Sequence, residues 1–374
     1  MPSSVSPGRS PSRILRRVAY ALVAVIVGLT IIEGMSSFLL LGFDVYQASS
    51  QKHVVTELQE EFHCQYDREL GWANIPGTKI PDFYGPGAGI SINQLGLRGA
   101  EVIPSNPKRK RLVCLGDSFT LGYGVDDAET FPEQLQQLAG EELQILNMGQ
   151  GGYSVGQSWL WLKRLMPEIR PDYVVCVFIW EDFRRLTRTR TVNGFSTPGF
   201  TFRNNRIDVN NIPVPRKLDA GTQLPAAVNF LSLASRRSGL VQGIQLLMDD
   251  DIVSLRDRAN ATGCGIIGEI AALCRAAECK LAVVLTPTLQ DLLNPIDYSV
   301  CAGTVSTFLL REGIPFTNLA PAFRTADSDG MFLEEEFHHY SAKGNRIVAD
   351  SLAEWLANTF PELKPVFAAL QPDP

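Results

Sequence analysis

From residue 111 to about residue 360, short apolar runs alternate with longer segments in which apolar residues recur every three or four positions. A short, continuous apolar run is typical of a strand buried on both faces of a parallel sheet, whereas the longer spacing is typical of a helix packed along one face. Strands that alternate with helices predict an α/β fold with a doubly wound, mainly parallel five-stranded sheet. The predicted strands are residues 111–115, 143–146, 173–180, 281–285 and 314–319.

Helical patterns lie between these runs. They are predicted at residues 131–138, 155–166 and 266–277 and from Ala342 onward. Ser341 is the predicted N-cap of the last helix, because a serine hydroxyl can accept a hydrogen bond from a free N–H of the first turn. Residues 184–250 interrupt the alternation, since they are rich in Asn, Pro, Arg and Ser and have no clear period. An insertion of this length is either a functional lid or disordered.

Arginines begin this insertion, directly after the third predicted strand. They are Arg184, Arg185, Arg188 and Arg190. One interpretation is that they overhang a site at the end of the sheet and bind an anionic substrate. A solvated loop is the plainer interpretation.

Residues 18–43 are apolar apart from Glu33 and a few small polar residues, and about 20 such residues can cross a bilayer. No acidic residue lies before this stretch, but four arginines do: Arg9, Arg13, Arg16 and Arg17. The positive-inside rule then keeps residues 1–17 in the cytoplasm and sends residues 44–374 to the periplasmic or extracellular side. A cleaved signal peptide is the competing interpretation, although no small-x-small site is followed by polar sequence. A buried soluble helix is the third, and the arginines disfavour it.

The patterns therefore predict a series of segments along the chain. They are a basic tail (1–17), a transmembrane signal anchor (18–43), a polar lead-in (44–110), an α/β domain (111–360) with its insertion at 184–250, and a C-terminal tail (361–374). Composition agrees, since 374 residues with 45% hydrophobic and 20% charged content fit one large domain plus an appendage. The net charge of −6 gives no indication of a nucleic-acid partner.

The candidate chemistry lies at the end of the first predicted strand, in Gly116-Asp117-Ser118. A strand that ends in a turn can lift a serine hydroxyl above the C-terminal edge of the sheet, where crevices form in open α/β folds. The hydroxyl is a weak nucleophile, so it needs a base and a group that orients the base. The chain has four histidines, and two of them follow a carboxylate in Glu336-Phe-His338-His339, just before the last helix. Together these features indicate a serine hydrolase.

The setting differs from the Gly-x-Ser-x-Gly elbow of the α/β-hydrolases, because Phe119 and Thr120 follow the serine. Three other stretches resemble blocks of the SGNH/GDSL hydrolase superfamily: Gly-Asp-Ser-Phe-Thr-x-Gly at 116–122, Asn147-Met-Gly149, and His339-Tyr-Ser-Ala-Lys-Gly344. The resemblance extends from about residue 111 to residue 355 and implies a flavodoxin-like sheet.

The resemblance also implies roles for individual residues. Ser118 is the nucleophile and His339 the base, and Glu336, in the place of the family's aspartate, orients the imidazole. The backbone N–H groups of Ser118 and Gly149 bind the oxyanion. His338 is the rival base, but the spacing to Gly344 favours His339.

The orienting carboxylate has rivals too. Glu334 and Glu335 stand beside Glu336, and a run of three acids is more often a solvated turn. Asp329 is a weaker candidate for the orienting group.

One block departs from the family pattern. Where the family has the asparagine of Gly-x-Asn-Asp, whose amide donates to the oxyanion, this chain has Glu181. An ionised carboxylate accepts hydrogen bonds and cannot donate one. Glu181 is therefore held protonated, or has another role, or leaves an oxyanion hole with two donors. Loss of one donor typically lowers turnover on the order of 10²–10³-fold.

Seven cysteines allow disulfides outside the cytoplasm. Cys114 and Cys176 fall inside predicted strands, where we expect free, buried thiols that act as small hydrophobes. The cysteines of the C-terminal third leave one or two bridges open, with no connectivity fixed by spacing: Cys264, Cys274, Cys279 and Cys301.

Neither a metal nor an organic cofactor is expected. The cysteine spacings match no zinc pattern. Gly149-Gln-Gly151-Gly152 loosely resembles a dinucleotide-binding loop, but Ser154 stands where the third glycine belongs, and no glycine loop continues into Gly-Lys-Ser/Thr.

The resemblance implies a membrane-anchored esterase or O-acyltransferase that acts on small acyl esters or on acyl esters of a cell-envelope glycan. Water as acceptor gives an esterase and a sugar hydroxyl gives a transferase. The alternative is a catalytically weak domain of the same fold that binds a glycan or a membrane partner, and Glu181 favours it.

Overall fold

The computed structural model of the chain describes residues 11–50, 63–104, 109–187, 196–215, 251–326, 329–334 and 338–367. The chain divides into two compact units. Unit 1 comprises Met1–Val54 and Leu218–Ile252, and unit 2 comprises Val55–Lys217 and Val253–Pro374. Each unit is described by itself.

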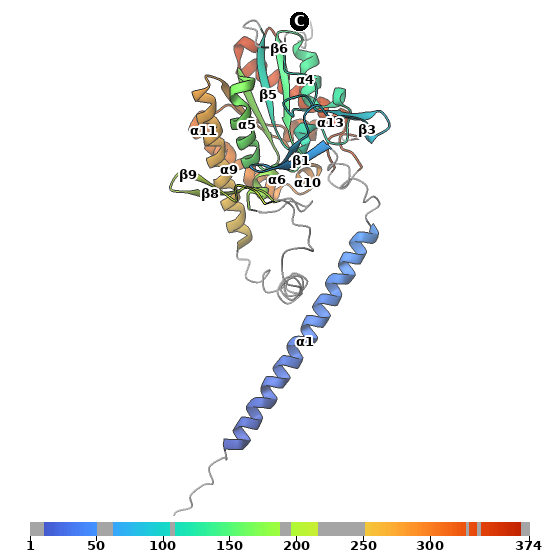
Figure 1. Cartoon of the computed structure of the whole chain (residues 1–374), viewed down its shortest axis with the longest axis vertical. Coiled ribbons are helices and arrows are strands. Elements are labelled where there is room, and N and C mark those ends of the chain that lie inside the picture. Colours follow the sequence, from blue (N-terminus) through green and yellow to red (C-terminus); the bar gives the residue numbers. More distant parts are fainter. Residues whose placement is uncertain are drawn as a thin grey trace, which may run out of the picture. The chain divides into compact units, whose positions relative to one another are not determined.

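The described part of unit 1 is dominated by one long helix, α1 (Pro11–Ser50) (Figure 1). Its segment Leu15–Ile32 has a mean hydropathy of 2.0 and is not buried by any other part of the chain. By length and composition this helix can cross a membrane, and a signal sequence has the same properties. The apolar helix predicted from residue 18 onward is therefore present.

The centre of unit 2 is a five-stranded sheet in the order β11-β10-β7-β5-β6. All of its neighbouring strands run parallel. The strands are β5 (Lys110–Gly116), β6 (Leu143–Gly149), β7 (Tyr173–Phe178), β10 (Lys280–Leu285) and β11 (Phe316–Asn318). This is the flavodoxin-like order, in which the first strand of the sheet lies between the second and the third. The chain reverses its direction of winding between β5 and β7, and crevices of such sheets form at that point.

Helices cover both faces of the sheet (Figure 1). One core cluster joins the sheet to α5 (Val155–Ile169), α9 (Asp251–Ala276) and α11 (Ile296–Glu312). A second cluster joins the other face to α4 (Phe131–Ala139), α12 (Ala320–Thr325) and α13 (Ala342–Thr359). Successive residues of β5 point alternately into the two clusters, as the pleat of a strand requires. The predicted doubly wound sheet is confirmed.

Some predicted boundaries differ from the structure. The third strand ends at Phe178, and helix α6 (Trp180–Arg184) begins two residues later. The predicted strand 173–180 is therefore two residues too long. The last strand is shorter than 314–319. The predicted C-terminal tail includes the 3₁₀-helix η3 (Pro361–Leu363), and Phe367 is 2% exposed, so this part of the tail packs on the sheet core.

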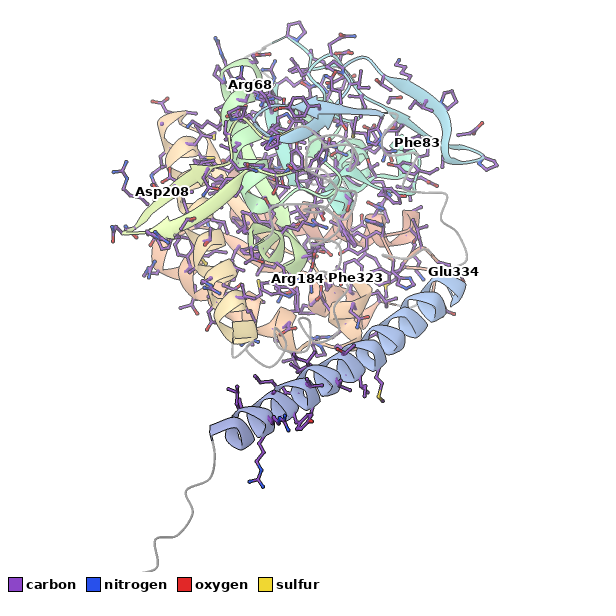
Figure 2. The ribbon with its side chains drawn as sticks, turned by 60° about the horizontal axis from the view of Figure 1, so that its bottom comes forward. Arg68, Phe83, Arg184, Asp208, Phe323 and Glu334 are labelled. Atoms are coloured by element: carbon purple, nitrogen blue, oxygen red, sulfur yellow. The ribbon has the colours of Figure 1, made fainter. Side chains whose placement is uncertain are left out.

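Two regions without a predicted element contain antiparallel hairpins. The lead-in forms β1 (Cys64–Asp67) with β2 (Gly71–Asn74), and β3 (Lys79–Gly85) with β4 (Ala88–Ser91). The insertion forms β8 (Gly199–Arg203) with β9 (Arg206–Asn210). Asp208 lies on this last hairpin, which projects at the edge of unit 2, and Phe83 lies on β3 (Figure 2). Residues 188–195 and 216–250 of the insertion lie outside the described residues.

Candidate active site

Ser118 stands directly after the first strand of the sheet, at the switch point. The short helix α3 (Ser118–Leu121) begins at the serine. The carboxylate of Asp117 accepts a hydrogen bond from the N–H of Phe119 at 2.9 Å and so caps this helix. Gly122 ends it in the left-handed region, at φ 85°, and its N–H donates to the Ser118 carbonyl. The turn leaves Ser118 only 6% exposed.

Two glycines at the ends of neighbouring strands make room for this turn. Gly116 and Gly149 are opposite each other on β5 and β6. A Cβ on Gly116 would collide with the Thr120 side chain and the Val177 carbonyl, and a Cβ on Gly149 would collide with the Leu121 backbone. Since no side chain fits at either position, α3 packs directly on the end of the sheet.

His339 lies 221 residues after Ser118 in the sequence, and the two side chains are in contact. Its Nε2 lies 2.9 Å from Ser118 Oγ, and both residues are buried. The second acceptor near the hydroxyl is Asp117 Oδ2, at 3.5 Å. The imidazole is therefore the closer acceptor for the hydroxyl proton, which is the geometry that a general base requires.

The loop that carries His339 is closed by a short antiparallel pairing, in which the N–H of Leu333 donates to the His339 carbonyl at 2.8 Å. His338 has φ 48°, in the left-handed region that histidine adopts more often than most residues. Its ring Nδ1 lies 3.0 Å from the Leu333 carbonyl, and the side chain is exposed. The structure brings His339 to Ser118 and directs His338 to the backbone.

Glu336, the predicted orienting carboxylate, lies outside the described residues, and so does Glu335. Its role stays a prediction. Asp329, the weaker candidate, is described, and its backbone carbonyl accepts a hydrogen bond from Lys343 Nζ at 2.7 Å.

Tyr340, the next residue after the candidate base, fixes the loop to the sheet. Its hydroxyl lies 2.7 Å from Thr286 Oγ1 and donates to the Pro287 carbonyl, just after β10. The amide of Asn345 donates to the Tyr340 carbonyl at 3.1 Å and accepts from the N–H of Phe131 at 2.9 Å. Burial raises the pKa of Tyr340 well above its ordinary value, so the phenol remains a donor.

The imidazole of His339 contacts two aromatic rings from the segment that begins at Ser118. The ring centroid of Phe119 is 4.7 Å away at an interplanar angle of 40°, and that of Tyr123 is 4.6 Å away at 35°. Phe119 is 4% exposed and Tyr123 is 7% exposed. The same turn that presents Ser118 therefore also holds the ring of the candidate base.

The predicted oxyanion donors differ in their surroundings. The N–H of Gly149 donates to Asn147 Oδ1 at 3.0 Å, and Asn147 Nδ2 donates to the Leu121 carbonyl at 3.2 Å. The Gly149 N–H would have to break its bond before it could bind an oxyanion. Among the described residues, none accepts a hydrogen bond from the N–H of Ser118 or of Gly152. Gly152 is partly exposed and lies in the turn that follows β6, at φ 73°.

Glu181 occupies the position of the family's asparagine, in α6. Its Oε2 lies 2.6 Å from Nε of Arg184, one turn along the helix, and the two side chains are 25% and 54% exposed. A carboxylate paired with a guanidinium is an acceptor, so Glu181 in this state supplies no donor to an oxyanion.

A charge cluster of two buried carboxylates and a partly buried arginine includes Asp117, the residue before Ser118. One nitrogen of Arg185 lies 2.9 Å from Asp117 Oδ2 and 2.7 Å from Asp182 Oδ1, and it also donates to the Tyr153 carbonyl. Asp182 Oδ2 accepts from the Ile179 N–H at 3.1 Å. Burial, and then the charge of Asp117, raise the pKa of Asp182 well above its ordinary value. The cluster thus links the N-cap of the nucleophile helix to α6.

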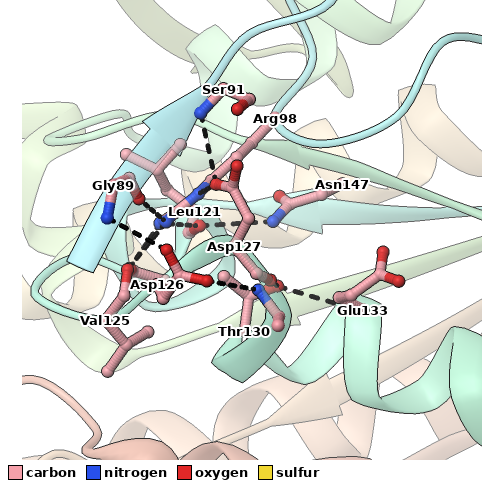
Figure 3. Close-up of polar contacts among 12 residues, drawn as sticks. Gly89, Ser91, Arg98, Leu121, Val125, Asp126, Asp127, Thr130, Glu133 and Asn147 are labelled. Atoms are coloured by element: carbon pink, nitrogen blue, oxygen red, sulfur yellow. Dashed lines mark hydrogen bonds and ion pairs between the residues drawn. The ribbon is translucent and has the colours of Figure 1, made fainter. Parts of the chain in front are cut away.

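The lead-in reaches the nucleophile turn through Arg98, which is 3% exposed (Figure 3). Its guanidinium donates to the carbonyls of Leu121 and Gly122 at 3.0 and 2.6 Å, at the end of α3. It also donates to the carbonyls of Gly89 and Val125, and it pairs with Asp127 at 2.7 Å. One side chain therefore joins β4 to the turn that carries the serine.

The lead-in also holds the turn after β6. Trp72 Nε1 donates to the Gly151 carbonyl at 3.0 Å, and Tyr153 donates through its hydroxyl to the Trp72 carbonyl. Gln157 Nε2 donates to the Leu70 carbonyl at 2.8 Å. Residues 63–104 consequently belong to the same unit as the sheet and support both loops of the site.

Several of these supporting residues are missed by sequence reasoning. A solvated loop is the wrong interpretation for Arg185, which pairs with two buried carboxylates. Arg184 is exposed but belongs to helix α6, and Arg188 and Arg190 lie outside the described residues. The sequence feature that could have indicated the role of Arg185 is Asp182, a second acid beside Glu181, because a buried carboxylate needs a cationic partner. Nothing in the sequence indicates that Arg98 contacts the serine turn.

No group of three or more His, Cys, Asp and Glu side chains that could hold a metal ion occurs among the described residues.

No protein-family model and no curated protein matches the chain. Among solved structures, the chain is similar to an aryl esterase from M. smegmatis, with 17% identity and a TM-score of 0.36, over 67% of this chain and 99% of that one. It is also similar to an acetylxylan esterase, Axe2 from Geobacillus stearothermophilus, with 13% identity and a TM-score of 0.37, over 68% and 96%. A third is a lipolytic protein of the G-D-S-L family from Desulfitobacterium hafniense, with 12% identity and a TM-score of 0.38, over 67% and 100%. Several of the matching structures are described as SGNH or G-D-S-L proteins or as acylhydrolases, the superfamily that the three sequence blocks resemble.

Proposed function

We propose that the chain is a serine esterase of the SGNH/GDSL type, with Ser118 as nucleophile and His339 as general base. The observation that carries this proposal is the 2.9 Å contact between His339 Nε2 and Ser118 Oγ at the switch point of the sheet. In the reaction, Ser118 Oγ attacks the ester carbonyl while His339 takes its proton. The imidazolium then protonates the leaving alcohol, and water repeats the sequence on the acyl-enzyme.

Glu336 is proposed as the group that orients His339, from its place three residues before the base. The oxyanion would be held by the N–H of Ser118 and by that of Gly149, whose hydrogen bond to Asn147 Oδ1 would have to break first.

The substrate is proposed to be a small acyl ester, such as an O-acetyl group on a glycan of the cell envelope. The helix α1 would anchor the protein in the membrane, with unit 2 on the non-cytoplasmic side. Transfer of the acyl group to a sugar hydroxyl is the same chemistry with a different acceptor.

Labelling with a fluorophosphonate tests the nucleophile without knowledge of the substrate. The purified full chain should be labelled, and Ser118→Ala and His339→Ala should each abolish both labelling and hydrolysis of a small aryl ester. His338→Ala is the matched control and should retain most of the activity, because its ring contacts the Leu333 carbonyl. Equal labelling of the wild type and Ser118→Ala would contradict the proposal.

The ion pair between Glu181 and Arg184 favours a second candidate function, a domain of this fold that binds a glycan with little catalysis. Glu181→Asn distinguishes the two. For an esterase limited by a missing donor, the new amide should raise turnover about ten-fold or more. Arg184→Ala breaks the same ion pair without adding a donor and should leave turnover unchanged. Absence of activity in the wild type and in both variants, with all three proteins folded, would favour the binding domain.

A further inference from the structure

The end of helix α9 is a turn that brings two cysteine side chains together. Beyond Ala276 the chain passes through Glu278, which has φ 55°. The N–H of Cys279 donates to the Cys274 carbonyl at 2.9 Å, and the N–H of Glu278 donates to the Arg275 carbonyl at 3.2 Å. These two bonds define the Schellman motif, in which the side chains of the residues at the two ends of the outer bond are commonly in contact.

Both end residues are cysteines here, in a position where most proteins place two apolar side chains. Cys274 is 1% exposed and Cys279 is 8% exposed, within the core cluster on the α9 face of the sheet. A hydrogen bond between the two thiols lowers the pKa of Cys279, and the same bond together with burial raises the pKa of Cys274. The pKa values of the two thiols are therefore shifted in opposite directions, and Cys279 is the more acidic of the pair.

No disulfide joins the seven cysteines, all of which lie in the described part of the chain. Helix geometry excludes one competing partner. Cys264 precedes Cys274 by ten residues on α9, which corresponds to about 15 Å along the helix axis. A disulfide needs Cα atoms within about 7 Å, so Cys264 cannot reach either residue of the turn without unfolding the helix.

We propose that Cys274 and Cys279 form an oxidative modification site, which closes into an intramolecular disulfide on contact with a disulfide oxidant. The Cys279 thiolate attacks one sulfur of the oxidant, whose S–S bond breaks and releases a thiolate that takes a proton. Cys274 then loses its proton and attacks the Cys279 sulfur of the mixed disulfide, which releases the second thiol. Two electrons pass from the cysteines to the oxidant.

The bond would tie the last turn of α9 to the start of β10, at the end of the strand opposite to Thr286. The disulfide would precede β10 in the chain, whereas Thr286 and Pro287, which contact Tyr340, follow β10. We therefore expect the disulfide to raise the thermal midpoint of the protein and to leave esterase activity unchanged.

Trypsin provides a direct test, because Arg275 lies between the two cysteines. The reduced full chain, purified in detergent, is incubated with oxidised glutathione, alkylated under denaturing conditions and digested. Cleavage after Arg258, Arg275 and Lys280 separates the cysteines onto the peptides 259–275 and 276–280. We expect these peptides to be joined and to separate on reduction. With Cys264 alkylated, the mass should be about 2 Da below the sum of the two peptides that carry Cys274 and Cys279 as thiols.

Variants assign the bond. Cys264→Ser, the matched control, removes the second cysteine of the longer peptide and should still give the joined pair. Cys274→Ser and Cys279→Ser should give none, with circular dichroism as the check on folding. Recovery of both Cys274 and Cys279 as alkylated thiols from wild type that was oxidised in the folded state, or of Cys279 joined to a different cysteine, would overturn the proposal. Because this readout does not involve Ser118, it stands apart from the test of esterase activity.

Discussion

At the scale of single residues, the contact of His339 with two aromatic rings bears on the rate of the proposed reaction. In that reaction the imidazole becomes an imidazolium while the ester is attacked, and aromatic faces stabilise a cation by about 0.5–2 kcal/mol. Phe119 and Tyr123 come from the turn that also presents Ser118, so the geometry of base and nucleophile is set by one segment.

Replacement of Tyr123 measures that contribution. Tyr123→Leu keeps an apolar side chain beside His339 but removes the ring, and we expect kcat on an aryl ester to fall roughly 2- to 30-fold, which is the rate equivalent of 0.5–2 kcal/mol. Tyr123→Phe is the matched control and should retain the wild-type value more closely. A leucine variant with the kcat of the phenylalanine variant would show that the ring does not stabilise the imidazolium.

The cluster of Asp117, Asp182 and Arg185 predicts a pH dependence of stability. The pKa of Asp182 is raised in the folded protein, mainly by burial and then by Asp117, above its unfolded value of about 3.9. The stability that this group contributes is therefore fully present below the unfolded pKa and is lost as the pH rises through the folded pKa.

Asp182→Asn removes this titration while it preserves an acceptor for the Ile179 N–H. The loss of unfolding free energy as the pH rises above the unfolded pKa of about 3.9 should be smaller in this variant than in the wild type, as measured by urea denaturation. Asp350→Asn, at an exposed ion pair with Arg346, should follow the wild-type pH profile. Parallel profiles for all three proteins would contradict the assignment.

At the scale of elements, the sequence predicts the sheet and misses the hairpins, for physical reasons. Strands buried on both faces, such as β5 and β7, are continuous apolar runs and stand out against the amphipathic helices. The hairpins of residues 63–104 and 199–210 are short and rich in glycine and polar residues. Their pairing depends on contacts with distant residues, such as that between Trp72 and Gly151, which no local pattern encodes.

The candidate site likewise has features that the sequence predicts and features that it does not. The proximity of Ser118 and His339 could be predicted, because each belongs to a motif at a strand end or before a helix. The hydrogen bond from the Gly149 N–H to Asn147 could not be predicted, because the sequence does not indicate which acceptor a backbone N–H uses.

The contact of the lead-in with the nucleophile turn predicts different costs for two arginines. Arg98→Lys leaves several carbonyls and the Asp127 carboxylate without their donors in a buried site, and we expect unfolding free energy to fall by about 3–5 kcal/mol. Arg164→Lys affects an exposed pair with Asp67 and Glu69 and should cost less than about 1 kcal/mol. Urea denaturation measures both. Equal effects of the two substitutions would show that Arg98 contributes no more than a surface ion pair.

At the scale of the whole molecule, the apolar helix predicts a compartment, and the oxidation state of the cysteine pair can test that prediction. Arginines before residue 18 predict that residues 44–374 are exported, and a disulfide between Cys274 and Cys279 would persist only where thiols are not kept reduced. The oxidation state of the pair in cells therefore reports on the side of the membrane that holds the sheet.

This prediction is tested in cells that express the full chain. The cells are quenched in acid, and their free thiols are then alkylated, so that thiols and disulfides cannot exchange after lysis. We expect the peptides 259–275 and 276–280 to be recovered as a joined pair, because the exported domain meets an oxidising environment. Cys114 and Cys176, which are buried in strands, should be recovered as alkylated thiols and serve as the internal control. If the purified protein closes the bond with glutathione but the cells yield both thiols free, unit 2 faces the cytoplasm, and the predicted topology is wrong while the cysteine site stands.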